Sequence, residues 1–239
     1  SGMAASYRLK QAGIPHTVFE KGHTVGGTWW KNTYPGVRLD TPNYAYSFSF
    51  AQRPDWPQQF SEGPEIHRYM REVAERGGIT RNIQMGTEVL SAAWDEDAGQ
   101  WELELSRGGR TERRRFNAVL SAVGQLDRPK FPDVPGMDDF AGVHMHSAEW
   151  DSRVDVAGKR VAVVGTGASA YQIVPAIVDR VSSLTVFQRS SPWMLPTPGY
   201  YEDMPQSVQW LVDHLPHYGQ WLRFWQHWLG VEGRQHTTA

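Results

Sequence analysis

The sequence contains no cysteine among its 239 residues. Without thiols the chain cannot form disulfides, thiolate metal sites or a redox-active cysteine pair. This excludes the class of two-nucleotide enzymes that pass electrons from a dinucleotide to a disulfide. Because no disulfide framework points to an oxidising environment, we expect a cytoplasmic protein.

Long apolar runs and an excess of one charge are also lacking. No stretch approaches the ~20 apolar residues that a transmembrane helix needs. The formal net charge is −2, which gives no reason to expect nucleic acid as a partner. The basic triplet at residues 113–115 is typical of a solvated strand face.

His144 and His146 have no carboxylate or thiolate set near them in the sequence, so we expect no metal site.

The feature around which the sequence is organised is a glycine-rich turn between a strand and a helix. Val161–Val164 predicts a buried parallel strand, and Ala168–Val178 has a helical pattern. Small residues in the Gly165–Gly167 turn let the backbone approach a pyrophosphate, which the helix N-terminus then binds. Ala170, at the third fingerprint position, still permits close packing of helix on strand. A second strand follows at Leu184–Gln188, so we predict a nucleotide site.

The end of the second strand indicates which dinucleotide would bind. An acidic residue there would bind a ribose 2′-hydroxyl and repel a 2′-phosphate. This chain has neutral Gln188 instead, followed by Arg189, Ser190 and Ser191. Since the planar fork of arginine suits a phosphate, we predict NADPH. The alternative is that Arg189 is merely a solvated residue at a strand end.

The N-terminal region repeats this plan. A helix over Tyr7–Gly13 ends in a glycine cap, and His16–Glu20 predicts a strand. If Gly2 is the last glycine of a fingerprint, Glu20 stands at the offset that Gln188 has in the second turn. An acidic residue there would bind a ribose hydroxyl, so we predict a first fold for a dinucleotide without a 2′-phosphate. The first strand and two glycines of that fold are absent, and we expect a fragment or a further N-terminal part.

A long aromatic segment, Val25–Asp40, follows the first strand. It is too irregular for a regular helix or strand, and loops of this length are usually functional. The pair Gly26–Gly27 permits close backbone approach to a ligand, and Trp29–Trp30 offers flat apolar walls for a ring system. The alternative is that the tryptophans cover the core. Arg38 and Asp40 would need each other or a charged cofactor if they were buried.

The remaining pattern completes an α/β fold class: two Rossmann-like dinucleotide-binding domains, the first with a small antiparallel sheet, plus C-terminal helices. We assign residues 1–155 to an FAD-binding domain and 156–239 to an NADPH-binding domain, both incomplete. Asn117–Gln125 predicts a short buried strand at the carboxyl edge of the main sheet. Other expected elements are a helix over Pro64–Gly77, β structure over residues 82–116 and helices over Pro205–Leu215 and Tyr218–Leu229. Within the β region, Glu88–Trp94 and Gln100–Ser106 alternate as strands do, and Arg107–Arg110 predicts a hairpin turn. The aromatic stripe of the last helix is either a core face or a surface for a membrane or partner.

The segment between the two folds carries the most specific motif. Phe140, Gly142, His146 and Trp150 fit FxGxxxHxxxW, which resembles the fingerprint of flavin-dependent Baeyer–Villiger monooxygenases. The final tryptophan favours this family over the general flavin monooxygenases. The stretches DTPNYAYSFSF, DWPQQFS and PTPGYYEDMPQSVQW are most similar to the 4-hydroxyacetophenone monooxygenase subgroup. Read in isolation, His146 would be a structural histidine that joins two domains.

The resemblance implies FAD and NADPH as cofactors, and a ketone and O2 as substrates. NADPH would reduce FAD, O2 would give a flavin C4a-peroxide, and one oxygen atom would be inserted beside the ketone carbonyl to give an ester or lactone. The implied FAD-binding residues are Gly2, Glu20, Gly27, Thr28, Trp29, Trp30, Asp40, Tyr46 and Val89. The implied NADPH-binding residues are Arg38, Leu39, Asp40, Gly165, Thr166, Gly167, Ala168, Ser169, Ala170, Gln172, Arg189 and Ser190.

Asp40 is the one catalytic residue that the resemblance implies in this chain. It matches a carboxylate that holds an active-site arginine, and that arginine lies in a later segment that this sequence does not contain. Two alternatives stay open. One is a flavin monooxygenase that oxidises amines or sulfides, and the other is a non-catalytic nucleotide-binding module.

Overall fold

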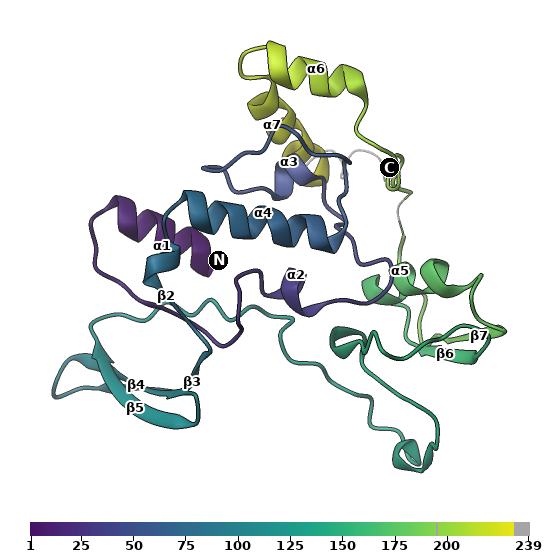
Figure 1. Cartoon of the computed structure of the whole chain (residues 1–239), viewed down its shortest axis with the longest axis horizontal. Coiled ribbons are helices and arrows are strands. Elements are labelled where there is room, and N and C mark those ends of the chain that lie inside the picture. The colour runs from purple at the N-terminus through teal and green to yellow at the C-terminus, as the bar shows by residue number, and fades with distance from the viewer. Residues whose placement is uncertain (195, 232–239) are drawn as a thin grey trace. The chain divides into compact units, whose positions relative to one another are not determined.

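The structure, a computed structural model, describes residues 1–194 and 196–231. The chain divides into two compact units that interleave along the sequence. Unit 1 comprises Ser1–Lys31 and Ile66–Glu149, and unit 2 comprises Asn32–Glu65 and Trp150–Ala239. Figure 1 shows the elements of both units. Residues 32–65 therefore pack with the second dinucleotide fold, although they precede it in the sequence.

Unit 1 contains the N-terminal fold. Its elements are α1 (Gly2–Gln11), β1 (Val18–Glu20), α2 (Thr28–Lys31), most of α4 (Gly63–Arg76), the short 3-10 helix Thr80–Asn82 and β2 (Ile83–Met85). β1 and β2 pair in parallel, and Val18 lies beside Ile83. One core cluster consists of Val25, Ala74 and Ile79, packed against Met3, Tyr7, Ile83 and Met85. The expected helices and first strand are confirmed, although α1 begins at Gly2 rather than at Tyr7.

A three-stranded antiparallel sheet forms the second part of unit 1. Its strands are β3 (Thr87–Asp95), β4 (Gln100–Arg107) and β5 (Arg110–Phe116), in the order β3-β4-β5. Gly108 and Gly109 have φ of 55° and 78°, which is the backbone that a tight hairpin requires. Leu103 and Leu105, which point to the same face of β4, are buried. The expected strands and the hairpin turn at residues 107–110 are confirmed.

Two expectations about unit 1 are wrong. Asn117–Gln125 forms no strand, and Leu120 and Val123 are 69% and 77% exposed. A strand needs a neighbour to pair its backbone groups, and no described strand runs beside this segment. The second expectation concerns residues 26–31, here called the glycine-tryptophan segment. It was expected to be irregular but contains the single helical turn α2. The amide of Lys31 donates to the carbonyl of Gly27 at 2.9 Å, because two glycines with positive φ let the chain enter a helical turn.

Unit 2 contains the second fold and the C-terminal helices. Its elements are α3 (Asn43–Tyr46), β6 (Arg160–Val164), α5 (Ala168–Ile177), β7 (Ser183–Phe187), α6 (Gln206–His214) and α7 (Tyr218–Val231). β6 and β7 pair in parallel on either side of α5 in sequence, so the predicted strand, turn, helix and strand are confirmed. The expected burial of the first strand is wrong, because no residue of β6 is buried and Val164 is 70% exposed. Short 3-10 helices lie at Met137–Asp139 and Ser147–Glu149 in unit 1.

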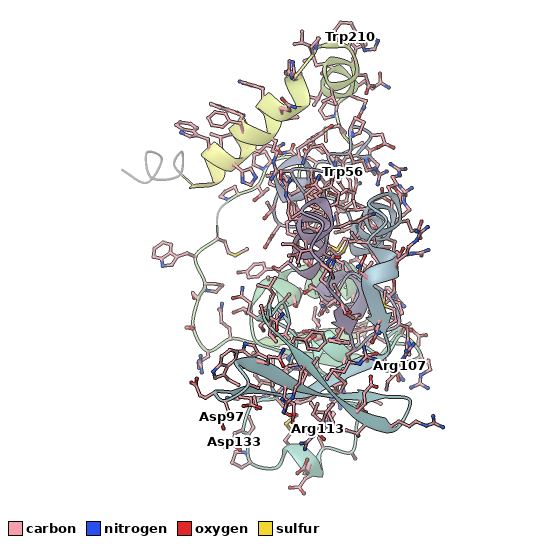
Figure 2. All side chains as sticks on the ribbon, turned by 90° about the vertical axis from the view of Figure 1, so that its left-hand side faces the viewer. Trp56, Asp97, Arg107, Arg113, Asp133 and Trp210 are labelled. Carbon is pink, nitrogen blue, oxygen red and sulfur yellow. The ribbon has the colours of Figure 1, made fainter. Side chains whose placement is uncertain are left out.

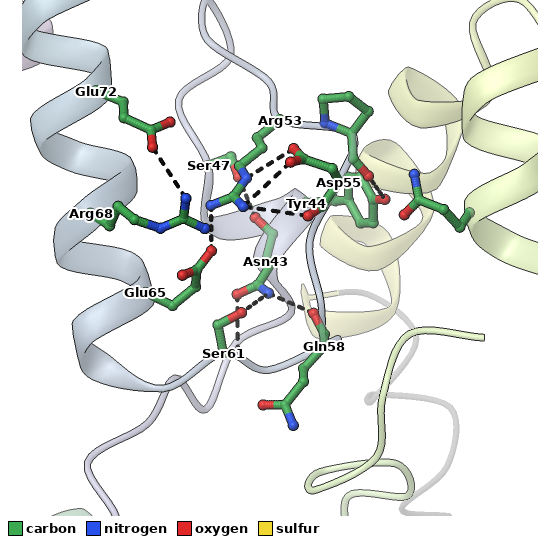
Figure 3. Close-up of polar contacts among 12 residues, drawn as sticks. Asn43, Tyr44, Ser47, Arg53, Asp55, Gln58, Ser61, Glu65, Arg68 and Glu72 are labelled. Atoms are coloured by element: carbon green, nitrogen blue, oxygen red, sulfur yellow. Dashed lines mark hydrogen bonds and ion pairs between the residues drawn. The ribbon is translucent and has the colours of Figure 1, made fainter. Parts of the chain in front are cut away.

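Polar side chains hold the irregular segment 32–65 in place (Figure 3). The amide of Asn43 donates to the carbonyl of Gln58 at 2.7 Å and to the hydroxyl of Ser61 at 2.6 Å. Arg53 donates to the carboxylates of Asp55 and Glu65 at 2.9 and 2.5 Å. These contacts replace the backbone pairing that a strand would supply.

The segment also contributes the largest fully buried side chain of unit 2. Trp56 is 2% exposed and lies among packed side chains, whereas Trp210 of α6 lies at the outer edge of its helix (Figure 2). Within residues 1–194 and 196–231, no helix is both long enough and apolar enough to cross a bilayer.

Candidate dinucleotide sites

The turn between β6 and α5 is open toward a ligand. Gly165 has φ of 103°, and its amide donates to the carbonyl of Phe187 at 2.9 Å, which fixes the turn to β7. A Cβ built on Gly165 or on Gly167 would meet no atom within 4 Å. Gly167 caps α5 without a side-chain hydrogen bond. The first amides of α5 and the positive end of its dipole are therefore suited to an anion.

The end of β7 adjoins this turn. The side-chain amide of Gln188 donates to the hydroxyl of Thr166 at 3.2 Å. Arg189 and Ser190 follow directly and are exposed. The structure thus brings the two ends of the predicted site, the glycine turn and the residues after the second strand, to one place. A guanidinium here lies beside a site that suits phosphate.

Gln172 and Arg38 meet away from solvent. Both are 8% exposed, and the Gln172 amide donates to the Arg38 carbonyl at 2.8 Å. The Arg38 guanidinium donates to the carbonyls of Phe60 and Tyr200 at 2.9 and 2.8 Å, and lies 3.3 Å from the Glu62 carboxylate. It also lies over the ring of Tyr201, 4.9 Å from the centroid. Asp40, two residues on, is exposed, so the buried Arg38 is compensated by other groups.

Two tyrosines join this contact. The hydroxyl of Tyr34 donates to the Gln172 side-chain oxygen at 2.9 Å, and the Gln172 amide donates to the Tyr200 hydroxyl at 2.8 Å. Burial raises the pKa of Tyr34 and the pKa of Tyr200, so both phenols keep their protons near neutral pH. Sequence reasoning missed Tyr200 and Glu62, because their roles depend on contacts with residues far along the chain.

In unit 1, Glu20 and Trp30 lie beside the same glycine. The Glu20 carboxylate accepts from the Gly22 amide at 2.7 Å. A Cβ on Gly22 would lie 3.1 Å from Glu20 Oε1 and 3.6 Å from Trp30 Nε1. The acidic residue at the end of β1 and the tryptophan of α2 are thus close together, as a shared ligand would require.

His67 of α4 supports the glycine-tryptophan segment. Its Nε2 donates to the Val25 carbonyl at 3.0 Å, and its ring centroid lies 5.6 Å from that of Trp30. A Cβ on Gly26 would lie only 2.8 Å from His67 Cδ2, so only glycine fits there. Desolvation lowers the pKa of His67, with the charge of Arg71 acting in the same direction. No sequence pattern distinguished this histidine from a polar residue on an amphipathic helix.

The other residues expected near a flavin are spread over both units. Gly2 begins α1, where a Cβ would lie 3.5 Å from the Cβ of Ala122. Gly27 and Thr28 are exposed, and Val89 is 43% exposed beside the bulge of β3. Tyr46, 42% exposed, belongs with Asp40 to unit 2.

The fingerprint segment runs across the end of unit 1 into unit 2. Phe140 is 61% exposed, and its ring occupies the place of a Cβ on Gly142, 2.5 Å away. His146 Nδ1 accepts from the Ala148 amide at 3.1 Å, which fixes its ring. In unit 2, Trp150 lines a cavity of about 440 Å³ together with Thr33, Pro35, Ser152, Val154, Asp155, Val156 and Arg180.

The Gly165–Gly167 turn beside the cationic end of β7, and the acidic Glu20 at the end of β1 after helix α1, are features of two dinucleotide-binding folds. The sequence profile of the flavin-binding monooxygenase-like family matches residues 1–210. The chain belongs to this family. Its α/β fold class is confirmed by solved structures. The chain is 32% identical to OTEMO in complex with FAD and NADP, with a TM-score of 0.82 over 92% of this chain and 42% of that one.

Other members of the family are similar over most of the chain. A closed structure of cyclohexanone monooxygenase is 33% identical, with a TM-score of 0.81 over 93% of this chain and 42% of that one. A Baeyer–Villiger monooxygenase of Streptomyces coelicolor is 46% identical over 82% of this chain and 37% of its own length. One of Pseudomonas aeruginosa is 41% identical over 83% of this chain and 37% of its own length. The chain therefore spans less than half of these relatives.

Proposed function

We propose that this chain provides the FAD- and NADPH-recognising part of a Baeyer–Villiger monooxygenase. The enzyme would insert one oxygen atom of O2 beside a ketone carbonyl to give an ester or lactone. The observation that carries the proposal is the open glycine turn at Gly165, which adjoins a cationic strand end through Gln188 and Thr166. The similarity to proteins named Baeyer–Villiger monooxygenase supports the ketone as substrate over an amine or sulfide.

FAD fits the unit 1 residues on chemical grounds. A Cβ on Gly27, which has φ of 52°, would meet no atom within 4 Å, so a ligand can approach this backbone closely. Glu20 would accept from the adenosine ribose hydroxyls, and Trp29 and Trp30 would flank the ring system. Gly2, Thr28 and Val89 belong to the same proposed set, as do Asp40 and Tyr46 from unit 2. FAD, once bound and reduced, would supply the electrons that activate O2.

NADPH fits the unit 2 residues. The backbone from Gly165 to Ala170 would bind the pyrophosphate through the first amides of α5. Arg189 and Ser190 would bind the 2′-phosphate, because a guanidinium fork matches its oxygens. Arg38, Leu39 and Asp40 would lie along the cofactor. We assign residues 1–155 to the FAD part and residues 156–239 to the NADPH part. Residues 32–65 lie within the first range of the sequence but pack with the NADPH part in unit 2.

Asp40 is the carboxylate that we assign to the oxygenation step. It is exposed and accepts a long hydrogen bond of 3.3 Å from the Thr41 hydroxyl, so its carboxylate faces solvent, where it could orient a cation. A positive group is needed there because negative charge develops on oxygen as the ketone is attacked. We expect Asp40→Ala to slow ketone oxygenation more than reduction of the flavin. Equal slowing of both steps would contradict this role.

The first test is the visible absorption spectrum of the purified chain. An oxidised-flavin spectrum that bleaches with NADPH in the absence of air supports both cofactors. Ester formation from 4-hydroxyacetophenone supports the proposed subgroup, whose aromatic stretches this sequence shares. Oxidation of a thioether without ester formation would favour the amine or sulfide alternative. NADP+ binding by a colourless protein that transfers no electrons would favour a nucleotide-binding module.

A further inference from the structure

Gln172, in the second turn of α5, has all its hydrogen-bonding positions filled by protein. Its side-chain oxygen accepts from the Tyr34 hydroxyl at 2.9 Å and from the Arg38 amide at 3.3 Å. Its nitrogen donates to the Arg38 carbonyl and to the Tyr200 hydroxyl, each at 2.8 Å. A glutamine side chain has two donor hydrogens and two lone pairs on its oxygen. No capacity is left for a ligand.

The contacts also fix which way the amide points. The backbone of Arg38 offers one donor and one acceptor, and Gln172 meets the donor with oxygen and the acceptor with nitrogen. A flipped amide would place like groups opposite each other. The side chain therefore pairs with Arg38 as a neighbouring strand would. The two phenols, which can donate or accept, complete the hydrogen bonds of this orientation.

The guanidinium of Arg38 is fixed by the same group of residues. It donates to the Tyr200 carbonyl at 2.8 Å, while the Tyr200 hydroxyl accepts from Gln172. Gln172 thus fixes the backbone of Arg38 directly and its side chain through Tyr200. Gly36 brings the two segments this close, because a Cβ there would lie 2.5 Å from the Gln172 carbonyl oxygen.

We propose that Gln172 is a positioning residue for NADPH binding: it holds Arg38 in place against the helix of the dinucleotide turn. It does so without contacting the cofactor. The inference rests on the proposed function, in which Arg38 lies along NADPH. It differs from the direct contact that the sequence resemblance implies for Gln172, because the side chain is already saturated within the protein.

The test is the dissociation constant of NADP+, measured by isothermal titration calorimetry on the purified chain. Gln172→Leu keeps the volume but removes all four hydrogen bonds, and we expect binding to weaken about ten- to hundredfold. Gln172→Glu, a near-isosteric second variant, loses both donors and should weaken binding at least as much. The matched control is Gln209→Leu on α6, which should leave the dissociation constant unchanged. The Gln209 side chain donates to the Asp213 carboxylate, one turn further along the same helix.

A double variant tests whether the effect passes through Arg38. If it does, Arg38→Ala and Arg38→Ala with Gln172→Leu bind NADP+ equally weakly, because the second change has nothing left to position. Effects that add independently would overturn the inference, as would a lower melting temperature with unchanged affinity in both Gln172 variants. If the folded unsubstituted chain binds no NADP+, the proposed function fails and the inference fails with it. If that chain binds and the Gln172 variants bind equally well, the inference alone fails.

Discussion

Gly36 allows the chain before Arg38 to pack closely against helix α5. It has φ of 79°, and a Cβ there would lie 2.5 Å from the Gln172 carbonyl oxygen and 3.1 Å from the Ala176 Cβ. We expect Gly36→Ala to destabilise unit 2 by about 2–4 kcal/mol, since backbone strain adds to a clash with helix backbone. Chemical denaturation would measure the loss.

Gly158 provides the control for Gly36. It has φ of 66° in the same unit, and a Cβ there would meet no atom within 4 Å. Gly158→Ala should cost only the backbone strain, about 1–2 kcal/mol. Equal losses at the two positions would mean that the Gly36 turn does not pack on α5 in solution.

His67 makes the stability of unit 1 dependent on pH. Desolvation lowers its pKa from an ordinary value of 6.5, so the unfolded chain binds a proton more readily than the folded one. Stability should therefore be complete above pH 6.5 and fall as the pH drops through the folded pKa. We expect His67→Gln to remove this part of the acid sensitivity, as measured by thermal unfolding from pH 7.5 to pH 5. An unchanged pH profile in the variant would assign the effect to another group.

At the scale of single residues, sequence reasoning found the groups that belong to local motifs. Glycines with open surroundings and the residues at strand ends follow from a pattern of neighbours in the chain. The saturated amide of Gln172 does not, because its partners Tyr34 and Arg38 lie more than a hundred positions away. His67 was missed for the same reason, since its contact with Val25 is set by how α4 packs.

Arg223 of α7 contacts the C-terminal end of α3. Arg223 donates from one nitrogen to the carbonyls of Tyr44, Ala45 and Ser47 at 2.6, 2.9 and 2.6 Å. These are the acceptors that a helix leaves unpaired at its C-terminus, where positive charge is also favoured. We expect Arg223→Leu to cost about 1–3 kcal/mol, because buried carbonyls lose their donor. Denaturation followed by tryptophan fluorescence would report it, since α7 carries three tryptophans.

Two further variants serve as comparisons for the stability loss in Arg223→Leu. Arg223→Lys keeps one charged donor and should lose less than Arg223→Leu. Arg153→Leu removes an exposed arginine that pairs with Asp151 at the surface, so it should change stability by no more than about 0.5 kcal/mol. A loss at Arg153 as large as at Arg223 would show that arginine removal in general, rather than the contact with α3, causes the effect.

At the scale of elements, the strand, turn and helix around Gly165 could be predicted because each carries its own signal: an apolar run, two glycines and a helical period. The prediction of a strand at Asn117–Gln125 rested on the same kind of signal, an apolar run, and was wrong. An apolar run shows only that a segment prefers burial, whereas a strand also requires a partner for its backbone groups. That partner is a property of the whole molecule and is not visible in the nine residues.

The whole molecule therefore exposes apolar side chains that its own described residues do not cover. Leu120, Val123 and Leu126 are 69%, 77% and 73% exposed in one run of unit 1. A contiguous apolar surface binds hydrophobic dyes, so we expect the purified chain to enhance the fluorescence of 8-anilinonaphthalene-1-sulfonate.

Substitution of this run should reduce dye binding without a loss of stability. We expect Leu120→Asn with Val123→Asn to lower the fluorescence enhancement and to leave the melting temperature unchanged, because both side chains are largely exposed. Leu105→Ala is the contrasting variant: that leucine is 0% exposed in β4, and its truncation should cost about 2–5 kcal/mol. If the double variant lowered the melting temperature as Leu105→Ala does, the run would be buried in solution, and a second copy of the chain would be the first cover to seek, by the dependence of melting on protein concentration.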